Sequence, residues 1–386
     1  MGQSNTILAN EFVVAKDFSN ATVDIASGGT LNLGTMDRRT FLSIADQDIN
    51  TNSSLNGRVN LTGGNFNAYL DGLVVGRKFG GPGFTTGELF AGNGGSVTIG
   101  DTGNTADMLV GRSVAGGTAI GTVDFGGLES FTANLNQMLI GTRLSGAVSG
   151  TVTLAAANAI AAISIVVGDG GGATLHLGQT NDILVSDLLI GGSFSNGLVN
   201  IPSGGTLNLG TPNRRTSLTI GKGFTNTNST FTGTFDLAGG ELIAYLDQVI
   251  VGEKDTNPGF QNGNLFISDQ PDNFIDANSI FIGGTRANGT VDFGGGTMAA
   301  RVIERGNGTA IFNWLGGTLH VDRFGSPATT FNLANNGLGA LAPGTSFVRR
   351  SVTGPSIVAS STFAPSARPS APKALRAGLG PGKYSA

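Results

Sequence analysis

The chain has 386 residues, a formal net charge of −4 and no cysteine. The missing thiols exclude disulfides, thiolate metal sites and a cysteine nucleophile, and no apolar run of about 18 residues is present to form a membrane-spanning helix. Glycine is abundant at 64 residues but follows no Gly-X-Y period, which excludes collagen. Short runs of Val, Ile, Leu, Phe and Thr between glycines predict many short β-strands joined by tight turns, rather than disorder.

A large block of the sequence occurs twice. Residues 18–84 match residues 194–260 at a constant offset of 176, with 37 identities in 67 positions and no gap. The stretch from Ser27 to Thr35, for example, returns unchanged from Ser203 to Thr211. This match indicates the duplication of a unit that contains several structural repeats.

A shorter repeat runs through the block and beyond it. Three apolar or β-branched residues followed by glycine recur every 23–35 residues, with the glycines at positions 76, 111, 141, 168, 191, 221, 252 and 283. A second phrase, Gly-Thr-Val-Asp-Phe-Gly-Gly, stands at 121–127 and again at 289–295. A third strand-like run follows Gly-Gly pairs, as at 30–33 and 318–321. These phrases predict three short strands in each repeat.

The physical chemistry of one repeat predicts a coil. Because side chains alternate along a strand, Val123 and Phe125 face inward while Thr122 and Asp124 face outward, and a glycine pair then turns the corner. No single coil buries its inner face, but stacked coils share a continuous core. We therefore expect an all-β, right-handed parallel β-helix (β-solenoid) of about ten coils of three short strands, about 50 Å long at the strand spacing. A sandwich or propeller fits less well, because the repeats vary in length and the chain has one tryptophan.

The composition changes near residue 341. Six of the 12 prolines follow it, and no acidic residue follows Asp322. We predict a glycine-rich solenoid over residues 1–340 and a Pro/Ala/Ser-rich basic tail over 341–386, which is extended or disordered. Such a tail is either a solvated linker or an electrostatic tether for an acidic or anionic surface.

Few residues suggest chemistry. His176 and His320 stand in the similar phrases Thr-Leu-His-Leu and Thr-Leu-His-Val, which predicts equivalent outward positions several coils apart. Asp71 and Asp247 recur in the duplicated block, five or more coils apart, too far for a carboxylate pair. We therefore expect no catalytic residue, no metal site, no cofactor and no enzyme activity.

Two arginine pairs are the remaining candidates for a site. Arg38 and Arg39 return as Arg214 and Arg215 in the duplicated block. Guanidinium groups bind anionic groups in a bidentate manner, so these four residues are candidates for contact with an anion or a glycan. A solvated turn is the alternative.

The repeated phrase also resembles a known class of proteins. The pattern apolar-Ile/Val-Gly followed by Gly-Thr-Val-x-apolar-x-Gly-Gly-x-Leu, over most of residues 15–325, resembles the β-strand repeats of bacterial autotransporter passengers. It is similar as well to repeats in large surface proteins with PEP-type C-terminal sorting signals. The resemblance implies a secreted β-helical stalk or adhesin. The chain departs from the pattern in lacking a translocating β-barrel, a sorting helix and a visible signal peptide.

These observations lead to two expectations of function. The first is a structural or adhesive surface protein, extracellular or on the cell surface, whose partner is a second copy in a fibre or coat, or an extracellular glycan. The second is a carbohydrate-binding or polysaccharide-degrading β-helix protein. We expect no nucleic-acid partner and no transmembrane segment, and a cytoplasmic location is the alternative to export.

Overall fold

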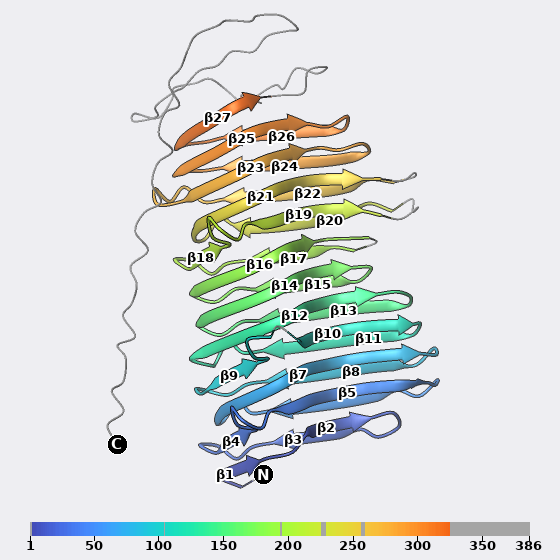
Figure 1. Ribbon diagram of the computed structural model, residues 1–386. Coiled ribbons are helices and arrows are strands. Elements are labelled where there is room, and N and C mark those ends of the chain that lie inside the picture. The colour runs from blue at the N-terminus through green and yellow to red at the C-terminus, as the bar shows by residue number, and fades with distance from the viewer. Residues whose placement is uncertain (1, 104, 194, 225–228, 256–258, 325–386) are drawn as a thin grey trace, which may run out of the picture.

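The computed structural model describes residues 2–324 except 104, 194, 225–228 and 256–258. Within this part every named element is a β-strand, and 27 strands form two sheets whose strands pair in parallel. Figure 1 shows the coils stacked one on the next from β1 to β27. The predicted all-β parallel β-solenoid is therefore confirmed. The predicted tail, residues 341–386, and its boundary at 340 lie outside the described residues.

The strands divide into a larger and a smaller sheet. The 16 strands of the larger sheet are β1 (Ser4–Ile7), β2 (Glu11–Lys16), β4 (Thr30–Leu33), β5 (Thr40–Asn50), β7 (Asn65–Gly80), β9 (Ser96–Ile99), β10 (Ala106–Ala115), β12 (Ser130–Arg143), β14 (Ala157–Asp169), β16 (Thr180–Ile190), β18 (Thr206–Leu209), β19 (Thr216–Gly223), β21 (Glu241–Lys254), β23 (Phe274–Ile282), β25 (Thr297–Arg305) and β27 (Thr318–Phe324). The 11 strands of the smaller sheet are β3 (Ala21–Asp24), β6 (Leu55–Asn60), β8 (Phe84–Phe90), β11 (Thr118–Asp124), β13 (Ala147–Thr153), β15 (Gly172–His176), β17 (Gly197–Asn200), β20 (Phe231–Leu237), β22 (Gln261–Ile267), β24 (Ala287–Phe293) and β26 (Thr309–Trp314).

The coils differ from the prediction in construction. The smaller sheet has 11 strands over the described residues, so the stack contains eleven coils there, in agreement with the predicted number of about ten. In most coils two of the three predicted strands are fused into one long strand of the larger sheet. The long strand β12, for example, pairs with both β9 and β10 of the preceding coil.

Two consecutive outward residues explain this fusion. Along β12 the inward positions are alternate up to Leu135, and the next inward residue is Met138. Asn136 and Gln137 both lie between them and are not buried. The extra outward residue bends the strand as a bulge does, so the direction in which the inward side chains point changes here. The hydrogen-bonded pairing with the neighbouring strands continues on both sides of the bend.

One hydrophobic core runs through the stack. It extends from Val14 near the N-terminus to Leu319 in the last strand, and its members are buried side chains. Val123 and Phe125 are fully buried while Thr122 and Asp124 are partly exposed, as the alternation predicted. The core therefore joins every coil to its neighbours, which is the arrangement that stabilises repeat proteins.

The interior narrows to a waist where glycines of the two sheets meet. Gly111 of β10 adopts a φ of 63°, and a Cβ on Gly121 of β11 would lie 2.2 Å from the Gly111 nitrogen. Equivalent contacts recur in other coils, as between Gly87 and Gly76. The two early coils have Ala15 and Ala45 at this position, also with positive φ. The recurring glycine therefore serves close backbone approach as well as turning.

The duplicated block keeps its strand positions in the structure. β3 and β17 begin at residues 21 and 197, and β4 and β18 at 30 and 206. β7 and β21 begin at 65 and 241. Each pair is displaced by the same 176 residues as the sequence match, so the two copies form equivalent coils. Across the described residues no helix is long and apolar enough to cross a membrane.

Candidate functional site

An ordered row of polar side chains lies on the outer face of the larger sheet, immediately past the waist. Its members occupy the residue after each waist position and stand in register on successive strands. We call this row the charge ladder: Lys16, Asp46, Arg77, Arg112 and Thr142. Register neighbours in a parallel sheet project from the same face at close spacing, so these side chains interact from coil to coil.

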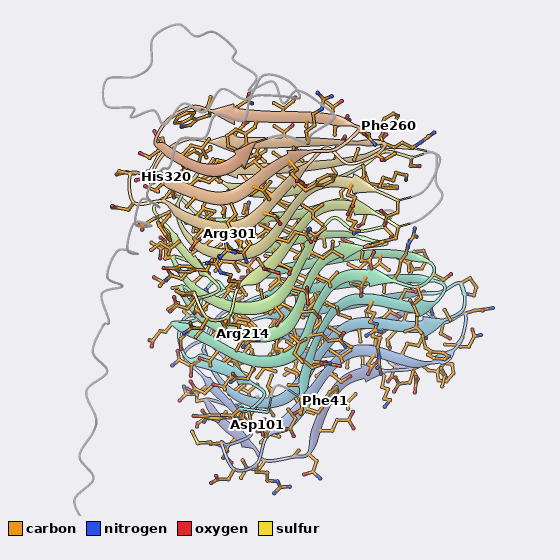
Figure 2. All side chains as sticks on the ribbon, turned by 45° about the horizontal axis from the view of Figure 1, so that its top comes forward. Phe41, Asp101, Arg214, Phe260, Arg301 and His320 are labelled. Carbon is orange, nitrogen blue, oxygen red and sulfur yellow. The ribbon has the colours of Figure 1, made fainter. Side chains whose placement is uncertain are left out.

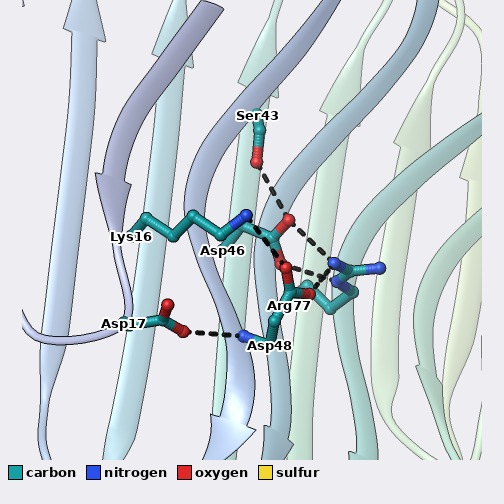
Figure 3. A network of polar contacts seen from close by, with 6 residues as sticks. All are labelled: Lys16, Asp17, Ser43, Asp46, Asp48 and Arg77. Atoms are coloured by element: carbon teal, nitrogen blue, oxygen red, sulfur yellow. Dashed lines mark hydrogen bonds and ion pairs between the residues drawn. The ribbon is translucent and has the colours of Figure 1, made fainter. Parts of the chain in front are cut away.

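The first part of the charge ladder forms an ion-paired network, shown in Figure 3. Arg77 Nε donates to Asp46 Oδ1 at 2.6 Å, and Nη2 donates to Asp46 Oδ2 at 2.8 Å. Arg77 also donates to Asp48, whose other oxygen lies 3.1 Å from Lys16 Nζ. The hydroxyl of Ser43 donates to Asp46 at 3.0 Å. Two cations thus balance two carboxylates across β2, β5 and β7.

Burial shapes the protonation of this network. Asp46 is only 3% exposed, and desolvation raises its pKa although the hydrogen bonds and charge of Arg77 oppose the shift. The pKa of Lys16 is raised chiefly by its hydrogen bond to Asp48. The network therefore stabilises the packing of the first coils but depends on Arg77 to keep a buried carboxylate ionised.

The second part of the charge ladder is not paired. Arg112 is half-buried, and no hydrogen bond or ion pair joins its side chain to any residue that the structure describes. Burial lowers the pKa of Arg112, and the neighbouring charge of Arg77 lowers it further while Asp107 opposes. Beside it, Thr142 is 9% exposed, and its buried hydroxyl oxygen has no hydrogen-bond partner.

The arginine pairs noted in the sequence lie elsewhere, in the loops before β5 and β19. Arg215 binds the Asp276 carboxylate at 2.8 Å and the backbone oxygens of Leu246 and Asp276. Arg214 donates to the Ala162 oxygen at 2.9 Å, and Figure 2 shows its place on the body. These bonds bind the loop to neighbouring coils.

The first copy of this pair has diverged from the second. Arg39 lies 5.9 Å from the Tyr69 ring centroid, and its Nη1 is buried without a hydrogen-bond partner. Arg38 is exposed. The residue in register with Tyr69 in the next coil is Thr98, whereas Asp276 is in register with Tyr245. Anion binding by the four arginines stays a prediction.

The two histidines do not occupy equivalent positions, and that prediction was wrong. His176 ends β15 in the smaller sheet, where its Nδ1 lies 2.7 Å from Asn200 Oδ1. His320 lies in β27 of the larger sheet, at the far end of the body in Figure 2. Strands of both sheets alternate with the same period of two, so the phrase Thr-Leu-His did not distinguish between them.

The duplicated aspartates lie far apart at equivalent corners. Asp71 is exposed on β7 and Asp247 is exposed on β21, where it accepts a hydrogen bond from Asn278 at 2.7 Å. Six strand spacings separate β7 from β21 in the sheet, or about 29 Å. They do not form one carboxylate pair. Among the described residues no group of three His, Asp or Glu side chains is placed to hold a metal ion.

A shallow groove crosses the smaller sheet over β13, β15, β17 and β20. Its volume is about 400 Å³, and small and polar residues line it. Hydroxyls of Thr151, Thr174 and Thr234 and the amide of Asn196 are among them. The lining has no aromatic ring and no carboxylate, so it offers hydrogen bonds but neither a stacking surface nor an acid–base pair.

Sequence reasoning missed the charge ladder, although a signal was present. Apart from Lys16 and Asp46, each member of the charge ladder directly follows a glycine of the repeat. Arg77, for example, follows Gly76, and Arg112 follows Gly111. That fixed offset placed the residues on one line once the coils were stacked. Comparison with known proteins gave no match among family models, curated proteins or solved structures.

Proposed function

We propose that this chain is a structural or adhesive β-solenoid of the cell surface or extracellular space, able to assemble through its ends. The observation that supports it best is the uninterrupted core from Val14 to Leu319. Such a core makes one stiff rod rather than a set of domains. Inter-coil hydrogen bonds on the outer faces add to this stiffness, including Asn60 to Asp24 and Asn288 to Asn262.

The N-terminal end supports the assembly part of this proposal. Among the described strands, β1 and β3 end their sheets, and β2 pairs only with β5. The core side chains at this edge are incompletely covered, because Phe12 and Val23 are partly exposed whereas Leu42 and Val59 of the next coil are 1% exposed. A second copy that added its strands to this edge would bury them, and head-to-tail contacts of this kind produce filaments.

Negative-stain electron microscopy over a concentration series tests the proposal. We expect filaments whose length grows with concentration, together with rising mass in sedimentation. The variant Phe12→Lys places a charge on the open edge and should abolish filaments. The control Phe18→Lys alters a 68% exposed loop residue and should leave them intact. Isolated rods of about 50 Å at every concentration would refute assembly.

A carbohydrate-binding protein is the second candidate, because the groove of the smaller sheet offers a row of hydroxyl and amide groups. A glycan array separates the two candidates. Retention of a neutral oligosaccharide that is lost in Thr174→Val would favour this candidate over the structural one.

A further inference from the structure

Arg112 carries a charge without an ion-pair partner on the charge ladder, within the described residues. It stands in register between Arg77 and Thr142. The charge of Arg77 is already balanced by the carboxylates of Asp46 and Asp48. Arg112 has no such partner within the described residues, and its half-buried position limits its access to water. The ladder thus presents one free guanidinium.

Thr142 supplies a second unused polar group at the same place. Its side chain is 9% exposed, and its oxygen is buried without a hydrogen-bond partner. A buried hydroxyl without a partner is uncommon and costs free energy. Because Arg112 and Thr142 are register neighbours on one face of the sheet, a single ligand can use both.

We propose that Arg112 and Thr142 form a carboxylate-binding site on the outer face of the larger sheet. The planar fork of a guanidinium matches the two oxygens of a carboxylate, and the hydroxyl donates a further hydrogen bond to one of them. One free positive charge suits a monoanion, whereas a phosphate dianion would bring an excess of negative charge. A bound carboxylate would also offset the repulsion that Arg77 exerts on Arg112.

The surroundings and the proposed surface function point to a uronate unit of an acidic polysaccharide. The partly exposed Leu139 stands three residues before Thr142 on the same strand and adds an apolar side chain to this face, whereas its register neighbour Leu109 is buried at 6% exposed. A sugar acid has both a carboxylate and an apolar ring face. This choice of ligand rests on the proposed adhesive function, whereas the carboxylate site itself does not.

Calorimetric titration with oligogalacturonate tests the site, with the methyl-esterified oligomer as the neutral probe. We expect the acid form to bind and the ester not to bind. Arg112→Gln should weaken binding on the order of tenfold or more, and Thr142→Val by a smaller factor. Arg58→Gln is the matched control, because Arg58 lies on the smaller sheet in an exposed ion pair with Glu88, and its loss should change nothing.

Two further arms keep the result decisive. If Arg112→Gln does not fold, Arg112→Lys retains the charge without the fork and should still weaken binding. Free galacturonate separates the site from the polymer: Arg112-dependent binding that is no tighter for the oligomer would support the site and overturn the surface-glycan ligand. Binding that is unchanged in both Arg112 variants, equal loss in Arg58→Gln, or no binding of either probe would overturn the site itself.

Discussion

Lys78 is a fully buried cation on β7, on the inner side of the sheet just past the waist. Its ammonium donates to the side-chain oxygen of Gln47 and to the Thr51 oxygen at 3.1 Å, and no carboxylate pairs with it in the described part of the chain. Burial lowers its pKa from 10.5. The equivalent Lys254 is also buried, with its pKa lowered for the same first cause. Both lysines bear the cost of desolvating a charge.

The stability of the protein should therefore depend on pH through Lys78. Below the folded pKa the buried ammonium must remain charged, so its full penalty is present there. The penalty falls as pH rises from the folded pKa to the ordinary value of 10.5, and the wild type should gain stability relative to Lys78→Met over that window. Urea unfolding of both proteins at several pH values between about 7 and 10 measures the difference.

Lys16 provides the control of opposite sign. Its pKa is raised above 10.5 by Asp48, so the stability that it contributes is fully present below that value. The difference between the wild type and Lys16→Met should stay constant up to about pH 10. A parallel slope in both comparisons would contradict the assignment to Lys78.

Gly121 should not tolerate a side chain. Its Cβ would lie 2.2 Å from the Gly111 nitrogen and 2.4 Å from the Val75 oxygen, which are backbone atoms that cannot rotate away. We expect Gly121→Ala to reduce the free energy of unfolding by about 3 kcal/mol or more, at the upper end of overpacking effects. Gly172→Ala is the control, because a Cβ there meets nothing within 4 Å. Thermal unfolding compares the two variants. Similar losses of stability in both would contradict the close backbone contact at the waist.

At the scale of elements, the network of Figure 3 joins β2, β5 and β7. Arg77→Met would leave the buried Asp46 carboxylate without its ion-pair partner, which should reduce the free energy of unfolding by about 1–3 kcal/mol. Protonation would remove the unpaired charge, so this loss should shrink as pH falls through the raised pKa of Asp46. Chemical unfolding at neutral and acidic pH measures both effects.

The double variant Asp46→Asn with Arg77→Met provides the check on this explanation. Because the neutral amide needs no cation, it should recover part of the lost stability and remove the pH dependence. A double variant that is less stable than Arg77→Met alone would mean that the arginine stabilises the coils by packing and not by pairing.

The same elements explain what the sequence could predict. The alternation of polar and apolar residues from Thr122 to Phe125 and the recurring glycines were sufficient to predict parallel coils, because both signals are local in the sequence. The fusion of two strands at Asn136 and Gln137 was not predicted, since two outward residues in succession resemble a turn. The meeting of Arg112 with Thr142 could not be predicted either. It depends on how two successive coils, 30 residues apart in the sequence, align with each other. Because the corner loops vary in length, the sequence does not fix that alignment.

At the scale of the whole molecule, each strand pairs with strands of the adjacent coils, and few contacts, such as that of Arg215 with Asp276, reach further. Ser130 is in register with Ala157, and Ala157 is in register with Thr180. A coil can therefore be removed at matching points without changing which faces are inward. Repeat proteins tolerate such changes because their stability is close to a sum of unit and interface contributions.

Deletion of residues 157–179 should yield a folded, shorter rod. The join places Thr180 after Ala156, so Asn181 takes the place of Asn158, three residues after Ala155. Asn158 donates to the Ala155 oxygen at 2.7 Å, and Asn181 makes the same contact with Gly178 at 2.8 Å, so the buried amide keeps a partner. We expect cooperative unfolding, unchanged circular dichroism per residue, and a rod about 5 Å shorter in small-angle scattering. Deletion of 163–174 removes half a coil, so the strands that follow would meet the wrong sheet, and the chain should not fold. Equal tolerance of both deletions would contradict this strand register.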